Sequence, residues 1–149
     1  MTQFLTALPV FNEEKYVQEV LDQVLQHTDH VLVVDDGSTD NTTSILKERV
    51  KARGDVTVIH HETNRGYGAA LTTAFAYALH PREDGTCWKG LITIDCDGQH
   101  QPQLIPSFIA ALENPENNPP DIVSGSRYLA RLPNNDDAPE GRRHINMEI

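Results

Sequence analysis

Short apolar runs alternate along this chain with segments of helical period, and this alternation constrains the fold more than any other feature of the sequence. A short apolar run bounded by turn residues is typical of a buried strand, whereas apolar residues three and four apart are typical of a helix on a sheet. We expect strands at residues 4–8, 31–34, 56–60, 91–94 and 121–124, and helices at 12–27, 38–53, 69–79 and 102–112. The repeat predicts an α/β fold, with a mostly parallel sheet and helices on both faces.

Local chemistry predicts where the first of these elements begin and end. Pro9 is expected to stop the first strand, because proline has no N–H to donate to a sheet. Asn12 is expected to cap the first helix, with Glu13 and Glu14 favourably placed in its first turn.

Composition limits what such a chain binds. At 149 residues it is long enough for one domain, and no apolar run approaches the roughly 20 residues that span a bilayer. The formal net charge of −10 argues against nonspecific nucleic-acid binding and against attachment to an anionic membrane by charge alone. Cys87 and Cys96 are too few and too irregularly spaced for a disulfide framework or a zinc site, which predicts reduced thiols in a cytosolic protein. The pair His60-His61 is interpreted as a strand end.

Carboxylates directly follow two of the predicted strands. The pair Asp35-Asp36 ends one apolar run, and Asp95 with Asp97 ends another. Two further polar segments follow predicted strands, at residues 9–13 and 64–68. Ligands of open α/β sheets bind at the carboxyl ends of the strands, and paired carboxylates there can hold a hard divalent cation beside a diphosphate. The pattern therefore predicts a nucleotide-like ligand with a metal-bound diphosphate.

Five short motifs stand in order between residues 4 and 131. They are a Pro-x-aromatic-Asn-Glu opening, an Asp-Asp-Gly-Ser segment, an Asn-x-Gly-x-Gly loop, an Asp-x-Asp segment and a late Ser-Gly-Ser-Arg, within residues 8–13, 33–40, 64–70, 95–100 and 121–127. Together they resemble the glycosyltransferase family 2 catalytic domain, in particular its dolichol- and polyprenyl-phosphate sugar transferases. Five ordered motifs are far more specific than any one of them.

The resemblance implies a GT-A, Rossmann-like nucleotide-diphospho-sugar transferase fold and an inverting sugar transfer. It implies a donor of the GDP-mannose or UDP-glucose type, with Mg²⁺ or Mn²⁺ on its diphosphate. The implied donor-binding residues are Pro9, Phe11, Glu13, Asp35, Asp36, Asn64, Gly68 and Cys96. The implied metal-binding residues are Asp95, Asp97 and Gln99, and the implied catalytic residues are Asp95, Asp97 and Arg127, with Arg127 facing the phosphates or the acceptor.

The implied acceptor is polyprenyl or dolichol phosphate, which is already ionised and needs no strong general base. A glycan hydroxyl is the alternative acceptor and would need a carboxylate base. Residues 1–131 are expected to form the donor-binding part of the catalytic domain, and residues 132–149 a loop and the truncated start of an acceptor-side helix. A truncated acceptor groove would expose apolar surface, which favours a homo-oligomer. A lipid acceptor favours peripheral association with the cytoplasmic face of a membrane.

Several of these residues have a competing structural interpretation. Asp35 can stabilise a turn, Glu13 can favour the first turn of a helix, and Gly66 with Gly68 can permit a tight turn. Ordinary surface or loop roles are the alternative for His100 and Arg127.

Other functional classes fit the sequence less well. A dinucleotide-binding oxidoreductase would need a third glycine where Leu71 stands, and its motif would follow the first strand rather than the third. A sugar nucleotidyltransferase would carry a Gly-rich loop after residues 4–8, and none is present there. A non-catalytic donor-binding or assembly module stays open as the alternative function, because the acceptor half is missing.

Overall fold

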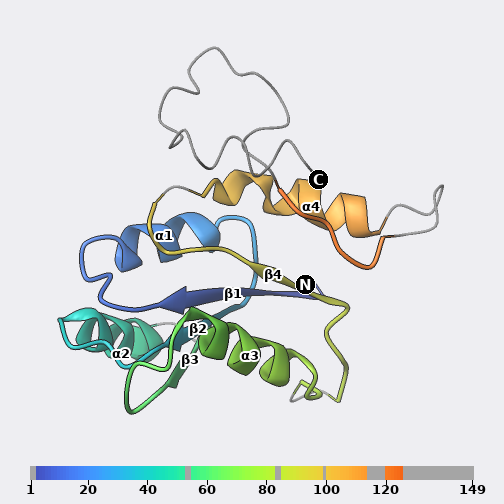
Figure 1. The fold of residues 1–149 in the computed structure, drawn as a ribbon. Coiled ribbons are helices and arrows are strands. Elements are labelled where there is room, and N and C mark those ends of the chain that lie inside the picture. Colours follow the sequence, from blue (N-terminus) through green and yellow to red (C-terminus); the bar gives the residue numbers. More distant parts are fainter. Residues whose placement is uncertain (1–2, 53–54, 83–84, 99, 114–119, 126–149) are drawn as a thin grey trace, which may run out of the picture.

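The computed structural model describes residues 3–52, 55–82, 85–98, 100–113 and 120–125. Strands and helices alternate along the chain (Figure 1). In order they are β1 (Phe4–Val10), α1 (Val17–Val24), β2 (Val31–Asp35), α2 (Thr42–Ala52), β3 (Val56–His60), α3 (Tyr67–Ala78), β4 (Gly90–Thr93), the 3-10 helix η1 (Pro102–Leu104) and α4 (Ile105–Leu112). Gln99, Arg127 and residues 132–149 lie outside the described residues, so what the sequence predicts for them stays a prediction.

The strands form one 4-stranded sheet of order β3-β2-β1-β4, in which all neighbours are parallel. The predicted α/β arrangement is confirmed. Because the strands are parallel, their carboxyl ends meet at one edge of the sheet. The register places Asp35 at the end of β2 opposite His60 at the end of β3.

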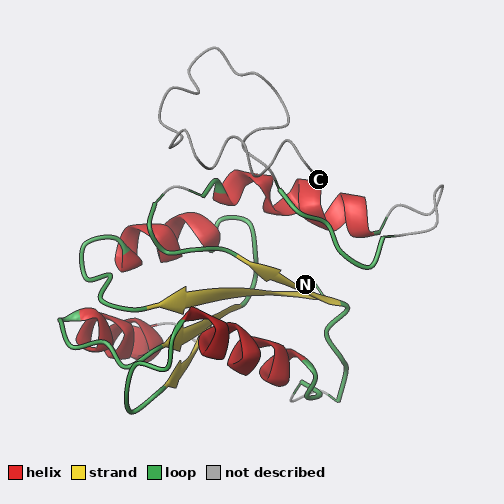
Figure 2. Cartoon of the chain, in the orientation of Figure 1, coloured by secondary structure: helices red, strands yellow, loops and turns green. Residues whose placement is uncertain are grey.

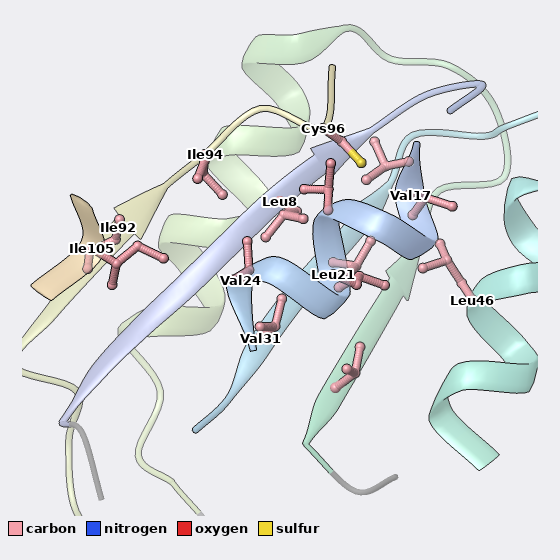
Figure 3. Close-up of a cluster of buried hydrophobic side chains, with 14 of the residues drawn as sticks. Leu8, Val17, Leu21, Val24, Val31, Leu46, Ile92, Ile94, Cys96 and Ile105 are labelled. Atoms are coloured by element: carbon pink, nitrogen blue, oxygen red, sulfur yellow. The ribbon is translucent and has the colours of Figure 1, made fainter. Parts of the chain in front are cut away.

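Helices cover both faces of the sheet (Figure 2). The larger hydrophobic cluster lies on the face covered by α1, α2 and α4 (Figure 3), and a smaller cluster lies under α3. The apolar residues of α1 are all buried at the predicted helical spacing, namely Val17, Val20, Leu21 and Val24. No helix of the described residues has the length and apolar character that crossing a membrane requires.

The strand predicted at residues 121–124 is wrong. Residues 120–125 adopt no strand, and the Ile122 side chain is 83% exposed. The segment lies against α4 instead, where a Cβ on Gly125 would come within 2.6 Å of the Phe108 ring. A short apolar run becomes a strand only where a neighbouring strand pairs with it, and within the described residues β4 pairs with β1 alone.

The prediction that Pro9 stops the first strand is also wrong. β1 continues to Val10, and Pro9 pairs opposite Val34. Ala7 and Pro9 face β4, since the Ile94 N–H donates to the Ala7 carbonyl. The β1–β4 pairing ends at Ala7, so the missing N–H of Pro9 leaves no ladder hydrogen bond unmade.

Asn12 does not cap α1, which begins at Val17. Its backbone φ is 56°, in the left-handed region that asparagine tolerates better than most residues. Its side-chain oxygen accepts the Thr39 N–H at 2.8 Å. Asn12 therefore ties the end of β1 to the loop before α2, a contact that local sequence cannot reveal.

Candidate active site

Two loops at the carboxyl ends of β1 and β2 are hydrogen-bonded to each other. The Glu13 N–H donates to the Thr42 hydroxyl at 2.9 Å, and the Glu14 carboxylate accepts the Asn41 N–H at 3.1 Å. These bonds hold the backbone that carries Glu13, a residue for which the sequence predicts donor binding. The position of Glu13 thus depends on the loop before α2.

The Asp35 carboxylate is buried and bonded within the protein. It has 0% exposure, and one oxygen accepts the Ser38 N–H at 3.0 Å. The other oxygen accepts the Thr43 hydroxyl at 2.7 Å and the His60 ring at 3.0 Å. Burial alone would raise the pKa of Asp35, but the hydrogen bonds from Ser38, Thr43 and His60 outweigh burial and lower the pKa. These contacts are those of a carboxylate that stabilises a turn.

Asp36 is also buried, and its oxygens hold the loop after β3. One oxygen accepts the His61 ring at 2.6 Å and the Arg65 N–H at 3.0 Å, while the other accepts the Gly66 N–H at 2.7 Å. Burial again works to raise the pKa of Asp36, and the bonds from His61, Arg65 and Gly66 outweigh it and lower the pKa. Asp36 therefore anchors the chain at the entrance to α3.

Gly37 lets the Asp35-Asp36 turn approach this loop closely. Its φ is 72°, which most side chains disfavour. A Cβ on Gly37 would lie 2.5 Å from the carbonyl carbon of Thr63 and 2.6 Å from the Asn64 nitrogen. Both contacts are with backbone, so any larger residue would push the two loops apart.

The roles of His60 and His61 were missed by the sequence analysis, which interpreted the pair only as a strand end. Both rings bond to the acidic pair of the neighbouring strand. The only available signal was an acidic pair and a histidine pair after two consecutive predicted strands. Interpreting that signal requires the register of the two strands, which the structure supplies.

Asp95 and Asp97 point away from the core. The chain alternates after β4, so that Ile94 and Cys96 are buried in the larger cluster (Figure 3), whereas Asp95 is 40% exposed and Asp97 is exposed. Burial, and then the charges of Glu13, Asp97 and Asp95, raise the pKa of the Cys96 thiol to about 12. The Cys96 side chain faces the core, which leaves its backbone as the part able to contact a ligand.

Two residues that the sequence analysis did not assign to the site contact Asp95. The Tyr67 hydroxyl donates to Asp95 Oδ1 at 2.8 Å, and the Asp95 N–H donates to His100 Nδ1 at 2.7 Å. Burial, followed by the hydrogen bond to Asp95, raises the pKa of Tyr67 to about 12, so the phenol keeps its proton near neutral pH. The available signal for Tyr67 was an aromatic residue within the polar segment 64–68 that follows a predicted strand.

Negative charge is concentrated between the ends of β1 and β4. The pKa of Glu13 is raised, first by burial and then by the charges of Asp97 and Asp40. Within the described residues, no group of three or more metal-binding side chains is assembled. Asp95 and Asp97 nevertheless offer the oxygen ligands that Mg²⁺ and Mn²⁺ prefer, and a cation there would offset the repulsion felt by Glu13. The residues present therefore fit the implied metal.

The other predicted donor-binding residues follow β1 and β3. Pro9 is buried within β1, and the Phe11 ring is half-exposed just beyond it. The Asn64 side-chain oxygen accepts the Gly66 N–H at 2.9 Å, which shapes the loop that enters α3. Gly68 has open space where a side chain would stand, so a ligand can approach the backbone of the first turn of α3.

The ordered motifs and the parallel sheet agree with a comparison against known families. The sequence matches glycosyl transferase family 2 over residues 6–148. The chain belongs to this family. Its fold is of the GT-A type: S. aureus TarS 1–349 superposes with a TM-score of 0.56 at 27% identity, over 75% of this chain and 32% of that chain.

Several relatives are similar over most of this chain. UDP-N-acetylglucosamine–dolichyl-phosphate N-acetylglucosaminyltransferase of Methanococcus voltae is 33% identical over an alignment of 133 residues, which covers 80% of this chain and 50% of that protein. Polyprenol monophosphomannose synthase of Mycolicibacterium smegmatis is 30% identical over an alignment of 128 residues, which covers 84% of this chain and 45% of that protein. S. aureus TarS 1–349 in complex with UDP has a TM-score of 0.54 at 26% identity, over 75% of this chain and 33% of that chain. The chain spans about half the length of the curated relatives it matches.

Proposed function

We propose that this chain forms the donor-binding part of an inverting glycosyltransferase. The donor is a nucleotide-diphospho-sugar of the GDP-mannose or UDP-glucose type, and the acceptor is a polyprenyl or dolichol phosphate. Residues 1–131 form the unit that binds the donor, and residues 132–149 lead toward the acceptor side. The support comes from the family and from the arrangement of carboxylates at the ends of β1 and β4.

The main support for this proposal is the pair of solvent-accessible carboxylates, Asp95 and Asp97. Both carboxylates face outward after β4, and Asp97 adds to the charge that raises the pKa of Glu13. Asp95 and Asp97, together with Gln99, are assigned to hold Mg²⁺ or Mn²⁺. Such a cation acts as a Lewis acid that neutralises the charge developing on the leaving nucleoside diphosphate.

The protein groups around this pair suit the rest of a sugar nucleotide. The first turn of α3 has no side-chain cap, and free N–H groups at a helix N-terminus favour a phosphate there. Pro9, Phe11 and Glu13 are assigned to the base and ribose, with Phe11 offering a half-exposed ring. Asp35 and Asp36 are assigned an indirect role, because their oxygens already hold the loops that form the site.

The acceptor is assigned from the relatives. The names of two of them specify dolichyl phosphate and a polyprenol product. An ionised lipid phosphate attacks the sugar without first losing a proton, so the reaction needs no strong base from the protein. A lipid acceptor places the reaction at a membrane surface, and we assign the cytoplasmic face, where the two thiols stay reduced.

Calorimetric titration tests the donor site directly. UDP, GDP, UDP-glucose and GDP-mannose are each titrated into the protein with Mn²⁺ and again with EDTA. Selective binding that needs the metal is expected, and it also identifies the base. Binding of none of the four, or binding that EDTA leaves unchanged, contradicts the proposal.

Three variants separate the metal site from a general charge effect. Asp95→Ala and Asp97→Ala are each expected to abolish metal-dependent binding and to leave the fold intact. Asp121→Ala removes an exposed carboxylate from the segment beside α4 and is expected to bind as the wild type does. Donor binding without transfer to a lipid phosphate would favour the alternative function, a donor-binding module that needs a further partner.

A further inference from the structure

His61 lies buried between β3 and α3 and bonds to both sides. Its side chain is 6% exposed. Nδ1 lies 2.6 Å from Asp36 Oδ1, and Nε2 lies 2.9 Å from the Thr73 hydroxyl, two turns along α3. One imidazole therefore joins the acidic turn after β2 to the body of α3.

The hydrogen-bond partners hold this ring from two sides. Asp36 is an ionised carboxylate and can only accept, so Nδ1, which faces it, carries a proton and donates. On the other side, Nε2 is hydrogen-bonded to the Thr73 hydroxyl, which also lies 3.0 Å from the Ala69 carbonyl. The buried Asp36 charge is thus hydrogen-bonded, as a buried charge must be.

The same Asp36 carboxylate also links His61 to the proposed donor site. Asp36 accepts the N–H groups of Arg65 and Gly66, which immediately precede α3. Tyr67, the first residue of α3, donates to Asp95. A shift of His61 would move the anchor of these two N–H groups, and with them the residue that contacts Asp95.

We propose that His61 is a positioning residue of the donor site, a clamp between Asp36 and Thr73 that holds the entrance to α3 against the ends of β2 and β4. This inference rests on the proposed function for its effect on the donor. The clamp itself exists in the protein without a donor, so it is testable separately.

His60 provides an internal contrast. It stands next in the chain and bonds to the neighbouring aspartate, but its side chain is half-exposed, and its other contacts do not include the Thr73 hydroxyl. The clamp is therefore specific to His61.

The central test compares two threonines on α3. Thr73→Val removes the hydroxyl that is hydrogen-bonded to Nε2, with little change in volume. Thr72→Val is the matched control, because the Thr72 hydroxyl donates to the Gly68 carbonyl in the same way but lies on the exposed side of the helix. Thr73→Ser restores the hydroxyl and is expected to restore wild-type behaviour. His61→Asn, which keeps a donor near Asp36 but cannot reach Thr73, complements Thr73→Val from the other end.

Three measurements are expected to report the clamp. Long-range ¹H–¹⁵N spectra of the donor-free protein should show that His61 Nδ1 carries a proton. Amide exchange at Arg65 and Gly66 should accelerate about tenfold in Thr73→Val and not in Thr72→Val. Metal-dependent nucleotide affinity should fall about tenfold in Thr73→Val and His61→Asn, since the binding groups are no longer pre-positioned.

Each contrary result has a distinct meaning. An unprotonated Nδ1 on His61 overturns the hydrogen bond to Asp36, and unchanged exchange at Arg65 and Gly66 in Thr73→Val overturns the clamp. Altered exchange with unchanged nucleotide affinity overturns the positioning role. Wild-type protein that binds no nucleotide overturns the proposed function instead, while the exchange comparison still decides the clamp.

Discussion

The chain has two acidic pairs at the ends of parallel strands, and the two pairs differ in burial and in hydrogen bonding. Asp35 and Asp36 after β2 are buried, and every oxygen accepts hydrogen bonds from within the chain. Asp95 and Asp97 after β4 are accessible, and the residue between them is turned into the core instead. One pair builds the edge of the sheet, and the other is available to a ligand.

The difference arises from the neighbours of each strand. β2 is an interior strand with β3 beside it, so histidine, threonine and backbone donors from adjacent segments surround Asp35 and Asp36. β4 is paired on one side within the described residues, and Asp95, which the Tyr67 hydroxyl contacts, stays 40% exposed. Two carboxylates after a strand therefore indicate a site only where the neighbouring strands leave them accessible to solvent.

The largest effect on stability is expected for Asp36→Ala. The substitution leaves the His61 ring and the N–H groups of Arg65 and Gly66 without their acceptor in a buried place, and breaking such a pair costs about 3 kcal/mol. Urea denaturation at neutral pH measures the free energy of unfolding. A loss below about 1 kcal/mol would mean that the carboxylate is not the anchor of this loop.

Asp35→Ala is expected to cost about 2 kcal/mol at neutral pH, through the bonds from Ser38, Thr43 and His60. Because folding lowers the pKa of Asp35, its stabilisation is present above the unfolded pKa of about 3.9 and is lost as the pH falls through the lower folded pKa. Urea denaturation from about pH 7 to about pH 2 should therefore show the wild type and the variant converging in acid. The free energy of unfolding of Asp121→Ala should follow the same pH dependence as that of the wild type. If Asp35→Ala also followed it, the Asp35 carboxylate would not be the stabilising group that its contacts indicate.

Tyr67→Phe is expected to have a smaller effect. It removes one hydrogen bond from a phenol to a carboxylate, and because solvent reaches this half-exposed carboxylate, we expect the loss to be about 1 kcal/mol. Because Asp95 keeps its backbone bond to His100, metal-dependent donor binding should weaken by less than about tenfold. Chemical denaturation and calorimetry measure the two quantities, and complete loss of binding would instead assign Tyr67 to the donor itself.

The smallest effect on stability is expected for Asp97→Ala. Its side chain is exposed and its charge opposes that of Glu13, so the free energy of unfolding should change by no more than about 0.5 kcal/mol. Metal-dependent donor binding should nevertheless be lost. If Asp97→Ala destabilised the protein as much as Asp36→Ala, the two acidic pairs would not differ in the way proposed, with one pair stabilising the fold and the other accessible to a ligand.

Much of the fold follows from local pattern. Four strands, the helices between them and the parallel sheet were predictable, because a buried strand gives a short apolar run and an amphipathic helix gives apolar residues three and four apart. The predicted strand at 121–124 failed because pairing needs a partner that local sequence does not specify. Pro9 and Asn12 were misjudged for a related reason: the side of the strand that Pro9 faces, and the Thr39 N–H that Asn12 binds, are set by other segments.

The sequence by itself determined that polar and acidic residues stand at the ends of strands, because their position after an apolar run is a property of neighbours in the chain. Only the tertiary structure decided which of the acids are buried and held by donors from neighbouring strands and loops. Asp35 and Asp36 meet His60 and His61 across 25 residues of sequence, and that meeting depends on the register of β2 against β3 and on Gly37 admitting the loop. Burial and hydrogen-bond supply are set by the packing of distant segments, so the same residue type is structural at one strand end and accessible at another.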